Sequence, residues 1–208
     1  MCIRDSVTTE TIKTIAERNG VEMYDVYTGF KWIANVMREN EGKKNYIGGG
    51  EESYGFLCED FVRDKDAVSA CVILAEIAAW AKDQGLSLYQ LLQKIYVEYG
   101  FSKEKGISVV KKGKSGAEEI EAMMKKLREN PLTEIAGSKV TYFYDYSTLK
   151  GKDYAENETV TLDMPTTSNV LQYFTEDNTK VSIRPSGTEP KIKFYMEVQG
   201  EMGCRNCY

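Results

Sequence analysis

Residues 64–85 read DKDAVSACVILAEIAAWAKDQG and contain the longest apolar stretch of the chain. Between Ala67 and Ala81, apolar residues occupy almost every side of a helix, as is typical of a helix buried between layers. The stretch is too short to span a bilayer. Asp64 and Asp66 stand at its start, where carboxylates interact favourably with the helix dipole. We therefore predict a buried helix that begins near these two acids.

Helical and strand-like segments alternate around this stretch. Residues 8–20, 29–40 and 87–100 show helical spacing, whereas residues 21–28 have strand character and residues 45–47 form a brief strand candidate. Such alternation predicts an α/β layer with mostly parallel strand pairing. The first six residues, MCIRDS, fall outside the pattern, so we expect regular structure to begin at Val7.

The texture of the sequence changes beyond residue 130. One more helix is predicted over residues 115–130, and short alternating segments rich in β-branched and aromatic residues follow it. These strand candidates cover residues 139–146, 159–164, 169–174, 180–185 and 191–198. The prediction is therefore a mixed α/β domain over residues 7–131, followed by a smaller strand-rich α+β domain over residues 132–208.

Composition narrows the possible functions. Among 208 residues, 42% are hydrophobic and 28% are charged, which is typical of a globular protein, and a net charge of −5 gives no overall attraction for nucleic acid. Five cysteines without a signal peptide favour a reducing cytoplasm, and no segment predicts membrane association. The chain contains no histidine, which excludes Ser-His-Asp and Cys-His catalysis as well as histidine metal sites.

Residues 48–55, GGGEESYG, combine three glycines with two carboxylates and a hydroxyl. The glycines suit a flexible loop around a ligand, but the carboxylates would repel a phosphate. In an extended segment Glu51 and Ser53 would point to one side, where they could accept hydrogen bonds from sugar hydroxyls and return one. The alternative is a solvated acidic turn.

Residues 181–195, VSIRPSGTEPKIKFY, predict two strands joined by a loop rich in anion-binding groups. Arg184 offers a planar fork for phosphate oxygens, and Ser186 and Thr188 offer hydroxyls beside the unobstructed amide of Gly187. Lys191 adds positive charge at the start of the second strand. A plain hairpin turn is the alternative, but the combination of cations and hydroxyls favours phosphate binding.

Three further patterns are weaker. GKS at residues 113–115 lacks the earlier glycine of a phosphate-binding P-loop, so an NTPase is disfavoured. Asp60, Asp64 and Asp66 could suggest a divalent metal, but nearby basic residues oppose a cation. The terminal CRNC at residues 204–207 has no second cysteine pair, so we expect no zinc site.

The motifs GEESYG, RDKDA and RPSGTEPKIKFY, in this order, resemble those of the α-D-phosphohexomutases, the phosphoglucomutases and phosphomannomutases. TGFKWI at residues 28–33 is similar to their substrate-facing turn, and the resemblance runs from about Val7 to Gly200. It implies a four-domain enzyme of which this chain holds the third and fourth domains. Such enzymes interconvert hexose 1-phosphates and 6-phosphates through a phosphoserine and a hexose 1,6-bisphosphate intermediate.

The resemblance also implies what is missing and which residues bind substrate. The phosphoserine loop and the Mg²⁺ loop belong to N-terminal domains not found here, so the chain is expected to be inactive by itself. Its implied partners are a sugar phosphate and those missing domains. Implied sugar contacts are Thr28, Gly29, Glu51 and Ser53; implied charges near the reacting end are Lys31, Arg63 and Lys65; implied phosphate contacts are Arg184, Ser186, Gly187, Thr188 and Lys191. A non-catalytic sugar-phosphate-binding protein is the alternative.

Overall fold

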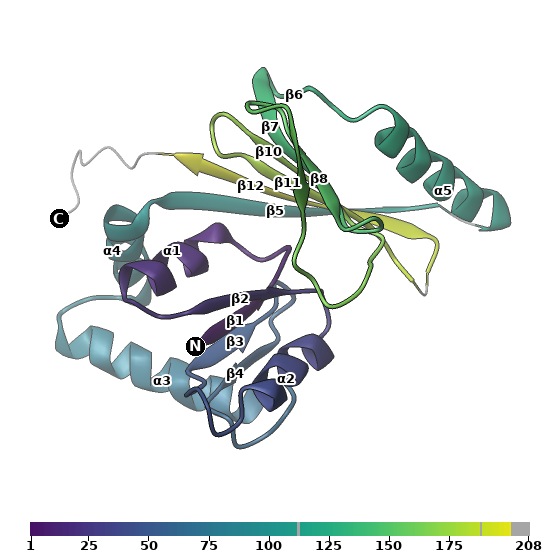
Figure 1. Cartoon of the computed structure of the whole chain (residues 1–208). Coiled ribbons are helices and arrows are strands. Elements are labelled where there is room, and N and C mark those ends of the chain that lie inside the picture. The colour runs from purple at the N-terminus through teal and green to yellow at the C-terminus, as the bar shows by residue number, and fades with distance from the viewer. Residues whose placement is uncertain (112, 188, 201–208) are drawn as a thin grey trace. The chain divides into compact units, whose positions relative to one another are not determined.

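The computed structural model describes residues 1–111, 113–187 and 189–200, which divide into two compact units (Figure 1). The first unit contains Met1–Ser102 and the second contains Lys103–Gln199. The sequence places the boundary later, at residues 131 and 132. The difference has a physical reason: the helix over residues 113–129 packs into the core of the second unit.

The first unit is a small α/β layer. Its elements are β1 (Cys2–Asp5), α1 (Glu10–Arg18), β2 (Met23–Val26), α2 (Phe30–Glu39), β3 (Gly48–Gly50), β4 (Phe56–Cys58), α3 (Ala67–Asp83) and α4 (Leu88–Tyr99). The sheet order is β2-β1-β3-β4, with β1 parallel to both neighbours and β4 antiparallel to β3. The predicted α/β layer with mostly parallel pairing is confirmed.

Strand β1 corrects the expectation that regular structure begins at Val7. It lies between β2 and β3 in the sheet, and the Ile3 side chain is 1% exposed (Figure 1). Arg4 is also buried, but its Nε lies 2.6 Å from Oδ1 of Asp25 and its Nη2 lies 2.8 Å from Oε2 of Glu10. Four residues that include a buried arginine show no apolar alternation, which is why the sequence does not predict this strand.

Helix α3 is confirmed as a helix but not as a buried one. It begins after Asp66, whose side chain accepts a hydrogen bond of 2.8 Å from the backbone N–H of Ser69. Of its residues only Ala81 is buried. Its exposed apolar side chains include Val68 at 73% and Trp80 at 55%. The helix therefore turns one side to its own unit and leaves an apolar surface in solvent.

The second unit is a strand-rich layer covered by one helix. Its elements are β5 (Phe101–Val110, which begins at the end of the first unit), α5 (Gly113–Glu129), β6 (Glu134–Ile135), β7 (Ser138–Asp145), β8 (Lys150–Asp153), β9 (Glu158–Thr161), β10 (Leu171–Thr175), β11 (Lys180–Pro185) and β12 (Lys191–Gly200). The sheet order is β5-β12-β11-β10-β7-β8-β9, and β6 pairs with β7.

Helix α5 forms the core of this unit together with one face of the sheet. Ile120 and Met124 pack in one cluster with the inward residues of four strands, among them Tyr173 and Ile183. The α+β character predicted for the second half is confirmed, with α5 as its helical layer (Figure 1). None of the helices in the described part of the chain is long and apolar enough to cross a membrane.

Candidate functional site

The three glycines of GGGEESYG form strand β3 rather than a flexible loop. A Cβ added to Gly49 would lie 2.4 Å from the Ile3 carbonyl oxygen and 2.7 Å from the Tyr46 hydroxyl. A Cβ on Gly50 would lie 2.8 Å from the carbonyl oxygen of Gly55. The glycines are therefore required by close backbone approach on both sides of a central strand, and flexibility is not their purpose.

The EESY segment turns directly after this strand. The backbone N–H of Glu51 donates to the carbonyl of Gly55 at 2.8 Å, which closes residues 51–55 into a short loop. Residues 52 and 53 are in a turn, so the extended geometry predicted for Glu51 and Ser53 is wrong. Ser53 is exposed and Glu51 is half-buried. The loop thus holds its carboxylate at the base and its hydroxyl at the surface.

The Glu51 carboxylate joins two motifs that are 22 residues apart, because its Oε1 accepts a hydrogen bond of 2.6 Å from the backbone N–H of Gly29. Gly29 has φ of 120°, a conformation that side chains rarely adopt, and it immediately precedes α2. Thr28 adjoins it in the chain. The structure therefore brings together Thr28, Gly29 and Glu51, three of the four predicted sugar contacts.

Neighbouring aromatic residues fix the turn at Thr28. Tyr27 is 4% exposed, and its ring meets that of Trp32 edge to face, with centroids 5.8 Å apart. Burial raises the pKa of Tyr27 to about 12. The turn is thereby anchored from the core side while Thr28 and Gly29 remain partly accessible.

Lys65 lies next to the same loop. A Cβ on Gly55 would lie 2.8 Å from Oε2 of Glu51 and 3.1 Å from Cδ of Lys65, so both side chains pack against this glycine. The Lys65 ammonium lies 5.8 Å from the centroid of the Phe30 ring, and its Nζ is 3.5 Å from Oδ1 of Asp64. Lys65 thus carries a positive charge to the edge of the Glu51 loop.

Lys31 and Arg63 line a cavity of about 400 Å³ in the first unit. Its other lining residues are Ala34, Asn35, Arg38 and Asp64. Arg63 is already engaged by Glu41, with Nη2 3.1 Å from Oε1. Arg38 was not identified from the sequence as a candidate site residue. It follows Lys31 by seven positions on α2 and therefore lies on the same helix face, and this spacing could have identified it.

The predicted phosphate loop connects β11 to β12 in an antiparallel hairpin. Ile183 and Ile192 belong to the core cluster, so Arg184 and its cross-strand neighbour Lys193 lie on the opposite face of the sheet. The backbone N–H of Ser186 donates to the carbonyl of Lys191 at 2.8 Å. The hairpin is real, as the plainer interpretation expected, and it carries two cations on one face.

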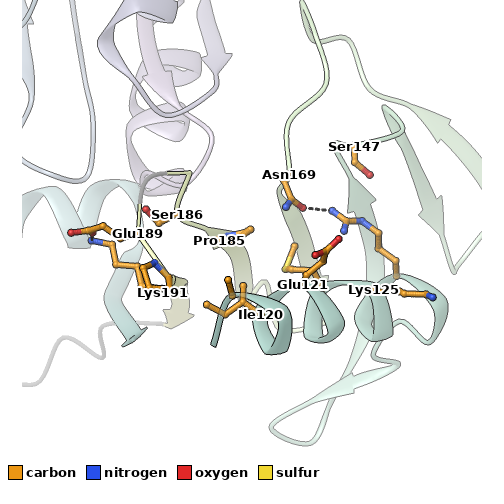
Figure 2. A pocket seen from close by; sticks show the side chains of 13 residues that line it. Ile120, Glu121, Lys125, Ser147, Asn169, Pro185, Ser186, Glu189 and Lys191 are labelled. Atoms are coloured by element: carbon orange, nitrogen blue, oxygen red, sulfur yellow. Dashed lines mark hydrogen bonds and ion pairs between the residues drawn. The ribbon is translucent and has the colours of Figure 1, made fainter. Parts of the chain in front are cut away.

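Ser186 and Lys191 instead line a cavity of about 620 Å³ between the hairpin and α5 (Figure 2). Lys191 is paired there with Glu189, whose Oε2 lies 2.5 Å from its Nζ. This hydrogen bond from the Lys191 ammonium lowers the pKa of the Glu189 carboxyl. A Cβ on Gly187 would meet open space. Arg184 is not among the residues that line this cavity, and Thr188 lies outside the described residues.

The helix side of this cavity was not predicted. Ile120 (Figure 2) contributes apolar surface. Met124 adds further apolar surface, and Arg128 contributes a guanidinium. Nε of Arg128 lies 3.2 Å from Oδ2 of Asp145, and its Nη2 donates to the side-chain oxygen of Asn169. These residues are far from the hairpin in sequence, and nothing in their local pattern indicates that they share a cavity with it.

The acidic residues proposed as a weak metal pattern serve other purposes. Asp66 caps α3, and the Ser69 backbone N–H that it accepts lowers its pKa. Oδ1 of Asp64 accepts from the backbone N–H of Lys65 at 2.8 Å. Within residues 1–111, 113–187 and 189–200, no group of three or more cysteine, aspartate or glutamate side chains is arranged to hold a metal ion. Cys204 and Cys207 lie outside these ranges.

Two family models cover nearly all of this chain. Residues 1–99 match the phosphoglucomutase/phosphomannomutase alpha/beta/alpha domain III, and residues 108–202 match the C-terminal domain of the same family. These ranges contain the Glu51 loop and the phosphate hairpin respectively. The chain therefore belongs to the phosphoglucomutase/phosphomannomutase family, and it contains regions matching domain III and the C-terminal domain.

Individual relatives agree with this assignment. Phosphoglucomutase of Staphylococcus haemolyticus is 37% identical over 94% of this chain and 35% of its own length. A phosphoglucomutase of Staphylococcus aureus is 38% identical over 96% of this chain and 36% of its own length. The chain thus spans about a third of the length of these relatives. In fold this chain is similar to pp63/parafusin, a phosphoglucomutase from Paramecium crystallised in an open form, with a TM-score of 0.68. The two sequences are 20% identical, and the match covers 99% of this chain and 34% of the parafusin chain.

Proposed function

We propose that this chain is the substrate-binding half of a phosphohexose mutase, an enzyme that interconverts hexose 1-phosphates and 6-phosphates through a hexose 1,6-bisphosphate. The hydrogen bond between Glu51 and Gly29 carries the proposal, because it joins the two motifs to which sugar contacts are assigned. In this proposal Glu51, Ser53 and Thr28 exchange hydrogen bonds with sugar hydroxyls.

The cations have two assignments. Lys31, Lys65 and Arg63 supply positive charge toward the phosphoryl group that is transferred, where charge stabilises the transition state. Arg184, Ser186, Gly187, Thr188 and Lys191 bind the phosphate that is not transferred. The phosphoserine and the Mg²⁺ that supports phosphoryl transfer belong to polypeptide outside these 208 residues, so this chain binds substrate without turning it over.

Calorimetry with glucose 1-phosphate tests the proposal on the 208-residue chain. Replacement of Arg184 by alanine is expected to weaken binding at least about tenfold, because a charge-assisted hydrogen bond to phosphate is lost. Lys105→Ala, a change at an exposed position of β5, is the matched control and should leave affinity unchanged. Binding that survives Arg184→Ala intact would show that the phosphate is held elsewhere.

A further inference from the structure

Tyr54 occupies an unfavourable position for a tyrosine. Its side chain is 99% exposed, so the ring gains nothing from packing in this chain. Its φ is 66°, in the left-handed region where a side chain strains the backbone and where glycine or asparagine is the usual residue. Neither the core nor the backbone therefore requires a tyrosine here. Strained residues that packing does not explain are concentrated at ligand sites.

The place of Tyr54 in the loop suggests what its ring is for. The loop is closed by the hydrogen bond from the Glu51 backbone N–H to the Gly55 carbonyl, and Tyr54 lies directly before that closure. The Glu51 carboxylate is fixed by Gly29, while the neighbouring Ser53 is exposed. A carboxylate, a hydroxyl and an aromatic ring thus lie on four consecutive residues of one short loop.

We propose that the Tyr54 ring is a platform for the apolar face of a pyranose. The inference rests on the proposed function and deepens it. A pyranose presents hydroxyls around its edge and C–H groups on its faces; the edge suits Glu51 and Ser53, and a C–H face suits an aromatic ring. The electron-rich face of the ring attracts the weakly positive C–H hydrogens and removes apolar surface from water. The strained tyrosine is then maintained by ligand recognition.

Two substitutions distinguish the contribution of the Tyr54 ring to binding from the effects of backbone strain and of the hydroxyl. Tyr54→Asn removes the ring but suits the positive φ, and Tyr54→Phe keeps the ring and removes the hydroxyl. In calorimetry, Tyr54→Asn should bind glucose 1-phosphate about tenfold more weakly, whereas Tyr54→Phe should stay within about twofold of the unsubstituted chain. Inorganic phosphate, which has no pyranose face, should bind both variants equally. Thermal unfolding of Tyr54→Asn should occur at the same or a higher temperature.

Each other outcome overturns the platform. Unchanged affinity of Tyr54→Asn for glucose 1-phosphate shows that the ring makes no contact. Equal losses in Tyr54→Phe and Tyr54→Asn assign the contact to the hydroxyl, and a lower unfolding temperature of Tyr54→Asn assigns the tyrosine to the fold. If the unsubstituted chain fails to bind glucose 1-phosphate, the proposed function fails and the platform fails with it. If binding depends on Arg184 but not on Tyr54, the platform alone is wrong.

Discussion

The carboxylate of Glu51 accepts a 2.6 Å hydrogen bond from the backbone N–H of Gly29 and thereby ties the loop after β3 to the start of α2. One oxygen of the carboxylate is used in this bond, while the other, Oε2, lies beside Gly55. The same side chain therefore joins the two motifs and keeps a second acceptor oxygen within the loop. This double use distinguishes Glu51 from the many exposed glutamates of the chain.

Glu51→Gln is expected to weaken the binding of glucose 1-phosphate by at least about tenfold while the fold persists. The amide can still accept from Gly29, but it loses the charge that strengthens hydrogen bonds from sugar hydroxyls. Calorimetry gives the affinity, and circular dichroism checks the fold. Glu17→Gln, on the exposed side of α1, is the control for loss of one negative charge. An affinity equal in both variants would remove Glu51 from the binding site.

Glu189→Gln is expected to strengthen phosphate binding by a few-fold. The Glu189 carboxylate pairs with the ammonium of Lys191, with Oε2 2.5 Å from Nζ, and its negative charge repels an incoming anion. Without that carboxylate, Lys191 is available to phosphate oxygens. Titration with inorganic phosphate at low and high salt measures the effect, which should shrink as salt screens the charges. Weaker phosphate binding in Glu189→Gln would mean that the carboxylate orients Lys191 for the ligand rather than competing with it.

Gly49→Ala is expected to destabilise the first unit by about 2–3 kcal/mol through overpacking. The added methyl group would lie 2.4 Å from the Ile3 carbonyl oxygen, and backbone on a central strand cannot easily move away. Urea unfolding measures the change. Gly106→Ala is a suitable control, since a Cβ there meets nothing within 4 Å and no positive φ is involved. Equal midpoints for the two variants would contradict this account of the glycine strand.

The acid sensitivity of the second unit should depend partly on Asp177. Hydrogen bonds led by the Thr175 hydroxyl lower its pKa from 3.8 to about 2 in the folded chain. A group whose folded pKa is depressed stabilises the protein above the unfolded pKa and loses that contribution as pH falls through the folded value. The unsubstituted chain should therefore unfold at a higher temperature than Asp177→Asn at pH 6. This difference in unfolding temperature should shrink as the pH falls from about 4 to about 2. A difference independent of pH would exclude this linkage.

The sequence predicts most elements of the fold but not the environment of each element. The periodicity of residues 64–85 correctly indicates a helix after Asp66, yet composition alone cannot tell whether another layer covers it. Strand β1 escapes prediction because its buried Arg4 is balanced by Asp25 and Glu10, partners that only the folded chain brings together. Periodicity reports local geometry, whereas burial and charge pairing depend on tertiary contacts.

For the candidate site, too, the sequence predicts the motifs but not the contacts between them. GEESYG and TGFKWI can be recognised as motifs, but the bond between Glu51 and Gly29 depends on the order of strands in the sheet. The glycines of β3 suggest a flexible loop in the sequence, but in the structure they are needed because neighbouring backbone lies too close for a side chain. The sequence does not show which backbone segments will be neighbours. The cavity beside the hairpin needs α5, which no motif connects to residues 184–191.

The apolar side of α3 that this chain leaves exposed is expected to favour association between molecules at high protein concentration. When two molecules meet through Val68, Trp80 and their neighbours, hydrocarbon leaves water, and mass action favours that encounter as the solution is concentrated. Affinities for a sugar phosphate should therefore be measured at several protein concentrations, and values that do not change would exclude this association. The indole of Trp80 is expected to fluoresce at shorter wavelength when the solvent around it is displaced, and replacement of Trp32, the other tryptophan, by phenylalanine would isolate that signal.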